Sequence, residues 1–103
     1  MQKYLSFMRL TEKGQVTPPE KVAEIYTKML AITESYGGKT LEVWTGIAEY
    51  DFVAITEFPT DDAAFKTTVK INQLGVARFF GAPTFPVDAY LAAAAEKKEL
   101  VAV

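Results

Sequence analysis

KTLEVWTGIAEYDFVAITEF, from Lys39 to Phe58, contains two runs in which apolar or β-branched side chains recur at every second position. This period is typical of β-strands, and the runs cover residues 39–47 and 51–58. Only residues 48–50 separate them, so an antiparallel hairpin is the simplest connection. The predicted tip of the hairpin consists of Glu49, Tyr50 and Asp51.

The second run also predicts which side chains face the core. Val53 and Ile55 are expected to face the helices that cover the sheet. Because successive side chains of a strand point to opposite faces, Phe52, Ala54 and Thr56 are then expected on the other face.

A helix is predicted before the hairpin. TPPE, residues 17–20, matches a capping box in which Thr17 is the N-cap, proline follows it and Glu20 stands at the third helical position. Apolar residues follow at helical spacing as far as Tyr36, and the glycines at 37–38 suit a helix C-terminus. Ahead of this helix, KYLSFMRL, residues 3–10, is predicted as a strand followed by a polar loop.

A second helix, a fourth strand and a short tail helix are predicted after the hairpin. Thr60 is expected as the N-cap of a helix that runs to about Gly75, with two aspartates in its first turn. The stretch from Val76 to Phe85 is predicted as a strand, and its glycine and proline suit a sheet edge or a bulge. A C-terminal helix rich in alanine is expected to open at Pro86.

This order predicts an α+β fold, the ferredoxin-like βαββαβ sandwich with a C-terminal helix, as one domain over residues 1–103. Two helices cover only one face of a four-stranded sheet. The other face also carries large apolar residues, Trp44 or Phe52 together with Phe58. We therefore expect a homodimer in which a second copy covers this face, sheet against sheet.

Composition excludes several kinds of chemistry. The chain has no histidine, which removes serine–histidine catalysis, histidine–zinc sites and the usual haem ligand, and no cofactor or metal is expected. It has no cysteine, so disulfides and thiolate chemistry are absent and a reducing cytoplasm fits. The net charge of −2 comes from interspersed charges, so nucleic acid is not an expected partner. Neither a signal peptide nor a membrane span is expected.

The hairpin tip allows a chemical and a structural interpretation. Tyr50 could donate a proton and Asp51 could act as a base or an anchor for a ligand at the mouth of a cavity. Structurally, Asp51 would bond turn amides and Tyr50 would pack over the core, and this interpretation is favoured. Glu42 and Trp44 share a strand face and could line a pocket, although an edge glutamate beside an interface tryptophan is favoured.

Two arginines complete the set of candidate ligand-binding residues. Arg9 and Arg78 each lie in an apolar strand and could bind a ligand carboxylate, but ion pairing to Glu42, Glu57 or Asp51, across the sheet or the dimer, is favoured. The acidic pair at 61–62 is better explained by the helix dipole than by a metal site.

Three stretches resemble the GYD-domain family, which is grouped with the dimeric α+β barrels. They are YLSFMRLTEKG at 4–14, EYDFVAITEFP at 49–59 with DDAA after it, and FPVDAY at 85–90. The chain departs from the family at the glycine that precedes the tyrosine segment, a place held here by Ala48, with Gly46 two residues earlier. The resemblance implies the fold and a dimer, but the family has no common reaction.

Two classes of function remain open. The first is a dimeric binder of a small organic molecule, or a cofactor-independent enzyme of the isomerase or oxygenase kind found in related barrels. The second is a non-catalytic structural, interaction or stress-related module. A cavity lined by Glu42, Trp44, Tyr50 and an arginine would favour the first class, and a solidly packed interior would favour the second.

Overall fold

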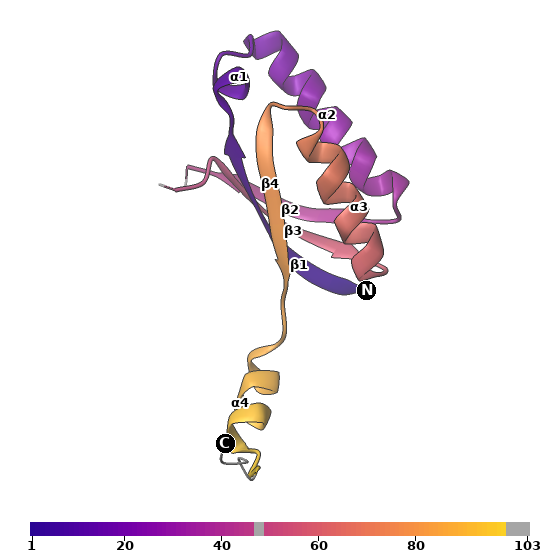
Figure 1. The fold of residues 1–103 in the computed structure, drawn as a ribbon, viewed down its shortest axis with the longest axis vertical. Helices are drawn as coiled ribbons and strands as arrows, with labels where there is room; N and C mark the ends of the chain where they lie inside the picture. The colour runs from indigo at the N-terminus through magenta and orange to yellow at the C-terminus, as the bar shows by residue number, and fades with distance from the viewer. Residues whose placement is uncertain (47–48, 99–103) are drawn as a thin grey trace, which may run out of the picture.

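The computed structural model describes residues 1–46 and 49–98 of the chain. They form a four-stranded antiparallel sheet in the order β2-β3-β1-β4, with α2 and α3 side by side on one face (Figure 1). This confirms the predicted α+β, ferredoxin-like fold. The elements are β1 (Gln2–Leu10), α1 (Glu12–Gln15), α2 (Pro19–Ser35), β2 (Lys39–Thr45), β3 (Phe52–Phe58), α3 (Asp61–Asn72), β4 (Ala77–Pro83) and α4 (Val87–Ala95).

The core lies between the sheet and the two helices and has two clusters of buried side chains. One joins Met29 of α2 to Ile71 of α3 and to the start of β4. The other packs the Tyr4 ring edge-on against Phe58 at 5.4 Å, with Ala63 of α3 beside them. The Tyr4 hydroxyl donates a hydrogen bond to the carboxylate of Asp61, which ties β1 to the first turn of α3.

The prediction for the faces of β3 is wrong. In the observed register Tyr4 pairs with Thr56, and this row of the sheet faces the helices. Phe52, Ala54 and Thr56 therefore face the core, and Val53 and Ile55 lie on the opposite face. Both sets of side chains are apolar or β-branched, so the alternation predicts the period of the strand but not its phase. Pairing with β1 decides the phase.

We call the surface opposite the helices the open face; its apolar residues are Leu5, Phe7, Trp44, Val53, Ile55, Phe80 and Ala82. No described element covers it. Trp44 is 45% exposed and Phe80 is 43% exposed. Phe58, and Phe52 as the alternative to Trp44, were expected on this face, but both face the helices instead.

The predicted start of α2 is also wrong. Thr17 does not cap the helix: its hydroxyl donates to the carbonyl of Lys13, and the N-cap residue is Pro18, which forms no side-chain cap bond. A residue that precedes proline is restricted to extended conformations, so the Pro18–Pro19 pair moves the helix start one residue further on. The predicted polar loop contains a one-turn helix, α1, and Thr11 caps it by accepting from the amide of Gly14.

The second helix begins as predicted. The Thr60 side chain accepts from the amide of Ala63 at 3.1 Å, with Asp61 and Asp62 in the first turn. The helix ends at Asn72, slightly before the predicted Gly75.

The connection between β2 and β3 is longer than the predicted three residues. β2 ends at Thr45 and β3 begins at Phe52. Gly46 has a φ of +92°, a conformation that residues with a side chain rarely adopt, so a glycine opens the turn two positions ahead of Ala48. Ala48 itself lies outside the described residues.

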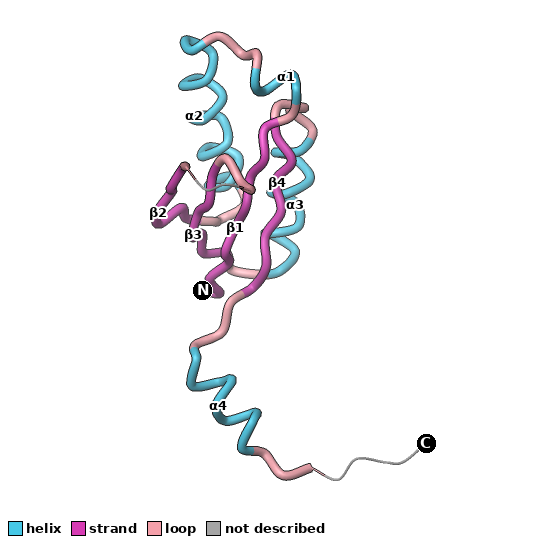
Figure 2. Tube along the Cα trace, turned by 90° about the vertical axis from the view of Figure 1, so that its left-hand side faces the viewer, coloured by secondary structure: helices cyan, strands magenta, loops and turns pink. Residues whose placement is uncertain are grey.

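β4 is an edge strand, as predicted, and it pairs with β1 from Ala77 to Pro83 without a bulge. The C-terminal helix opens after Pro86 as expected, but it packs against no other described element. It extends away from the sheet, as both views show (Figures 1 and 2), and stretches the chain to 57 × 29 × 26 Å.

Candidate functional site

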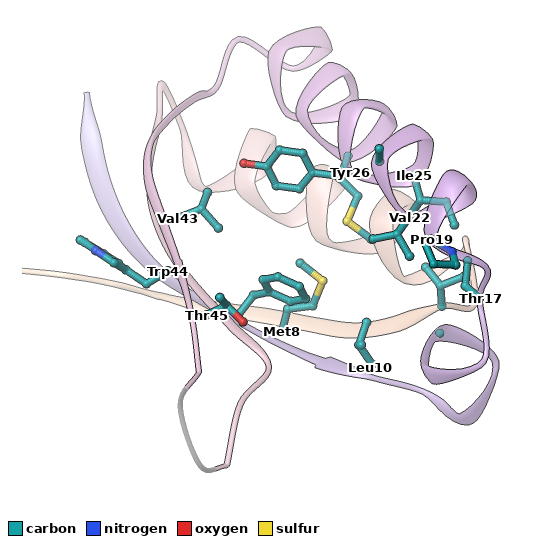
Figure 3. A pocket seen from close by; sticks show the side chains of 15 residues that line it. Met8, Leu10, Thr17, Pro19, Val22, Ile25, Tyr26, Val43, Trp44 and Thr45 are labelled. Carbon is teal, nitrogen blue, oxygen red and sulfur yellow. The ribbon is translucent and has the colours of Figure 1, made fainter.

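A pocket of about 480 Å³ lies between α2 and the helix-covered face of the sheet (Figure 3). Its walls are almost entirely apolar. Val22, Ala23 and Tyr26 of α2 form one side, and Met8 of β1 and Phe52 of β3 form the floor. The volume falls within the range of about 300–1,000 Å³ that is common for small-molecule sites.

The pocket exists because only the second half of α2 packs closely on the sheet. Met29 and Thr33 are buried, whereas Val22 is 46% exposed and Tyr26 is 41% exposed although both lie on the apolar side of the helix. The first turns of α2 follow the extended Pro18 and stand away from the sheet. The apolar side chains that α2 directs at the sheet therefore line a space instead of filling it.

A smaller space of about 40 Å³ adjoins the pocket and shares five residues with it, Met8, Tyr26, Met29, Val43 and Phe52. It extends into the core as far as Ser6, Thr33 and Thr56, all of them buried. The Thr33 hydroxyl donates to the carbonyl of Met29. The inner end of the pocket thus presents hydroxyl groups in a space that holds about one water molecule or one functional group.

The chemistry of the lining is limited. Tyr26 carries the only ionisable side chain among the residues that line the pocket and its inner extension. A charged ligand would lose its hydration without meeting an opposite charge, which is costly. The lining suits a neutral molecule with an apolar body, and it offers no carboxylate for proton transfer.

The predicted site residues lie elsewhere, mainly on the open face. The Tyr50 ring packs over Phe7 at 4.7 Å and against Phe80 at 5.7 Å. The Arg9 guanidinium lies over the Tyr50 ring at 5.8 Å and donates two hydrogen bonds to the carbonyl of Glu49. Tyr50 thus packs over the open face, where the partner copy was expected.

Asp51 has a structural position. Its carboxylate accepts a hydrogen bond from the amide of Leu10 at 2.8 Å, and its own amide donates to the carbonyl of Met8 at 2.9 Å. Asp51 therefore fixes the connection between β2 and β3 to β1. The expected acceptor role holds, but the donor is a strand amide instead of a turn amide.

The two arginines are neighbours on the open face, because Arg9 pairs directly with Arg78 in the sheet register. Neither of them forms an ion pair with a carboxylate of the described residues, whose ion pairs are Lys21–Glu24 and Lys66–Asp62. Among the described residues of one chain, the favoured pairing of the arginines with acids is therefore not found.

Glu42 and Trp44 share the open face of the edge strand β2, as predicted. The row that contains Trp44 and Phe7 separates Glu42 from the arginines, so the structure brings Arg9, Arg78 and Tyr50 together but leaves Glu42 apart. Of the predicted site residues only Trp44 borders the pocket, and Figure 3 shows its side chain directed away from Met8 and Tyr26.

The residues that line the pocket were missed because their pattern is that of an ordinary buried helix face. Val22, Ile25, Tyr26 and Met29 recur at helical spacing, which predicts a core. The one local signal is the double proline at 18–19, which sets the direction in which α2 leaves α1.

Among residues 1–46 and 49–98, no group of three acidic side chains converges as a metal site would require. The described helices include none with the length and apolar character needed to cross a membrane.

The fold and the pocket define a small α+β protein of the ferredoxin-like class with an apolar cavity under its first long helix. The GYD domain model matches residues 4–94, and the chain belongs to the GYD-domain family. No curated protein matches the chain.

Proposed function

We propose that this protein binds a compact neutral organic molecule in the pocket between α2 and the sheet. The observation that carries the proposal is the combination of an apolar, charge-free space of about 480 Å³ with hydroxyl groups at its inner end. Apolar walls supply affinity through burial, and a few polar groups orient the ligand. A ketone or hydroxyl group of the ligand would reach Ser6 and Thr56 while its apolar body contacts Met8 and Val22.

The lining favours binding over acid–base catalysis. A general acid or base that works near neutral pH needs a pKa near that pH, and Tyr26 is the only titratable side chain at hand. Isomerase or oxygenase chemistry of the kind considered for related barrels would therefore depend on the reactivity of the ligand itself.

A neutral fluorescent probe, N-phenyl-1-naphthylamine, tests the site. Ala23 lines the pocket, so Ala23→Phe should fill part of it and raise the dissociation constant of the probe at least tenfold. Ala31 is an exposed alanine of the same helix that does not line the pocket, and Ala31→Phe should change the constant less than threefold. Equal constants for the two variants, or no saturable binding by the native protein, would refute the proposal.

We also propose that the protein is a homodimer through its open face, which would make self-association part of its function. The support is the apolar open face itself, with Trp44 and Phe80 both exposed in the single chain. Soluble monomers rarely expose contiguous apolar patches of this kind. Phe80→Glu should dissociate the dimer in sedimentation velocity, whereas Phe80→Leu should preserve it, because only the glutamate buries an unpaired charge.

A further inference from the structure

The apolar side of α4 is exposed and packs closely on no other element of residues 1–46 and 49–98. Val87 is 70% exposed, Tyr90 is 72% exposed and Leu91 is 57% exposed, and these positions lie on one side of the helix because they are separated by three and four residues. Phe85, just before the helix, is 73% exposed.

A helix of this length does not account for its own stability. α4 has nine residues, and isolated helices shorter than about 12–15 residues are marginal in water even when rich in alanine. Most helical stability in proteins comes from packing of the apolar side. The packing partner of α4 must therefore lie outside the part of its own chain that the structure describes.

The base of α4 is held in a direction away from the sheet. The amide and the hydroxyl of Thr84 both donate to the carbonyl of Lys3, and the Gln2 side chain donates to the carbonyl of Thr84. Pro83 and Pro86 stand on either side of this segment and restrict its backbone. The segment acts as a fixed arm, and α4 does not reach the open face of its own chain (Figure 2).

The size of the open face bears on whether α4 takes part in the proposed dimer interface. Four strands about 4.8 Å apart and about 23 Å long give a footprint of about 440 Å². Each partner of a stable interface buries about 800 Å². Contacts beyond the projected area of the sheet would therefore strengthen a dimer.

The apolar side chains of residues 85–91 could supply such contacts. The exposed aromatic side chains of Phe85 and Tyr90 offer about 300 Å² of apolar surface. Val87 and Leu91 offer about 200 Å² more. A second copy bound to the open face would lie beside α4. Two-fold symmetry would then bring the α4 of each chain into contact with the other chain.

We propose that α4 is an exchanged arm that docks on a second copy of this chain, beside the dimer interface formed by the open faces. The proposal rests on the homodimer proposed above and is independent of the ligand pocket. It assigns residues 84–95 a role in assembly.

Two glutamate substitutions on adjacent residues of α4 test the arm in the full-length protein. Leu91 lies on the apolar side, and Ala92 lies on the opposite side of the same helix turn. Leu91→Glu should raise the dimer dissociation constant, measured by sedimentation equilibrium, at least tenfold. Ala92→Glu should change it less than threefold, because it introduces the same charge where no contact is proposed.

The Phe80→Glu variant distinguishes an error in the arm proposal from an error in the dimer proposal. If Phe80→Glu dissociates the dimer while Leu91→Glu and Ala92→Glu behave alike, the arm proposal is wrong and the open-face interface stands. If the native protein is monomeric at 100 µM, about a hundred times a micromolar dissociation constant, the dimer proposal and the arm proposal are both wrong. If Leu91→Glu lowers the unfolding midpoint equally at all protein concentrations, α4 packs on its own chain and the arm is refuted.

Discussion

At the scale of single residues, Tyr4 shows how one side chain connects a strand to a helix. It is buried among Phe58 and Ala63, and its hydroxyl donates to Asp61 at the start of α3. The hydrogen bond to this carboxylate, together with burial and the negative charge of Asp61, raises the pKa of Tyr4 to about 12. The protonated phenol is therefore part of the folded state.

We expect the stability of the protein to fall between about pH 10 and pH 12. Unfolded tyrosine loses its proton near pH 10, whereas folded Tyr4 keeps it until about pH 12, so the unfolded state gains relative stability as the pH rises through this range. Below pH 10 the contribution is fully present. Tyr4→Phe should lower the free energy of unfolding by about 1 kcal/mol at neutral pH and flatten the decline above pH 10. Urea titrations at pH 7, 10 and 11.5 measure both effects. If the unfolding free energy of the two proteins declined equally with pH, the assignment would be contradicted.

Asp51 gives a second test at this scale. Asp51→Ala removes the acceptor of the Leu10 amide and should cost about 1–3 kcal/mol of unfolding free energy. Asp51→Asn keeps a carbonyl oxygen there and should cost less. Glu49→Ala is the control, because Arg9 binds the backbone carbonyl of Glu49 and not its side chain. A loss of probe binding in Asp51→Asn at unchanged stability would instead support a chemical role.

At the scale of elements, the two helices that pack on the sheet begin in different ways. α3 has a threonine N-cap whose side chain satisfies a helix amide, whereas α2 starts at a proline pair without a side-chain cap. A capping box in the sequence therefore does not guarantee a cap, because the residue before a proline is kept extended.

Threonine-to-alanine substitutions at the two helix starts should separate these cases. Thr60→Ala should cost about 1 kcal/mol, and Thr60→Ser much less, because serine keeps the cap oxygen. Thr17→Ala should cost less than Thr60→Ala, since the Thr17 hydroxyl donates only to the exposed Lys13 carbonyl. Chemical denaturation measures the unfolding free energy of all three variants. An equal cost of the alanine substitutions at Thr17 and Thr60 would support Thr17 as an N-cap after all.

At the scale of the whole molecule, one chain is more extended than a compact domain of the same length. Its radius of gyration is 16.9 Å, whereas a compact chain of this length is expected to have about 13 Å. The excess comes from α4, and the open face adds a second unpartnered apolar surface. The proposed homodimer would account for both features.

If assembly completes the fold, the unfolding midpoint should rise with protein concentration, because the dimer is favoured over unfolded monomers by mass action. Calorimetry between 5 and 500 µM, about a hundredfold range, should show this rise for the native protein. Trp44→Glu should remove it by placing an unpaired charge on the open face, while Trp44→Leu should keep it. A midpoint independent of concentration in the native protein would contradict a dimer.

The sequence by itself determined the order of the four strands, the two long helices and the tail helix, together with the ferredoxin-like class, the Thr60 cap and the edge position of β4. These depend on local signals, such as period, capping residues and proline, which act within a few residues. It also indicated that both faces of the sheet are apolar, because hydrophobic periodicity is a property of each strand alone.

Only the tertiary structure decided which face of β3 meets the helices, since that phase comes from the pairing of Tyr4 with Thr56. The pocket likewise depends on how far the first half of α2 stands from the sheet, a distance that no local pattern encodes. The projection of α4 depends on the hydrogen bonds that fix Thr84 to Lys3, residues 81 positions apart in the chain. Such long-range contacts form only once the chain has folded, so they decided the candidate site that periodicity could not predict.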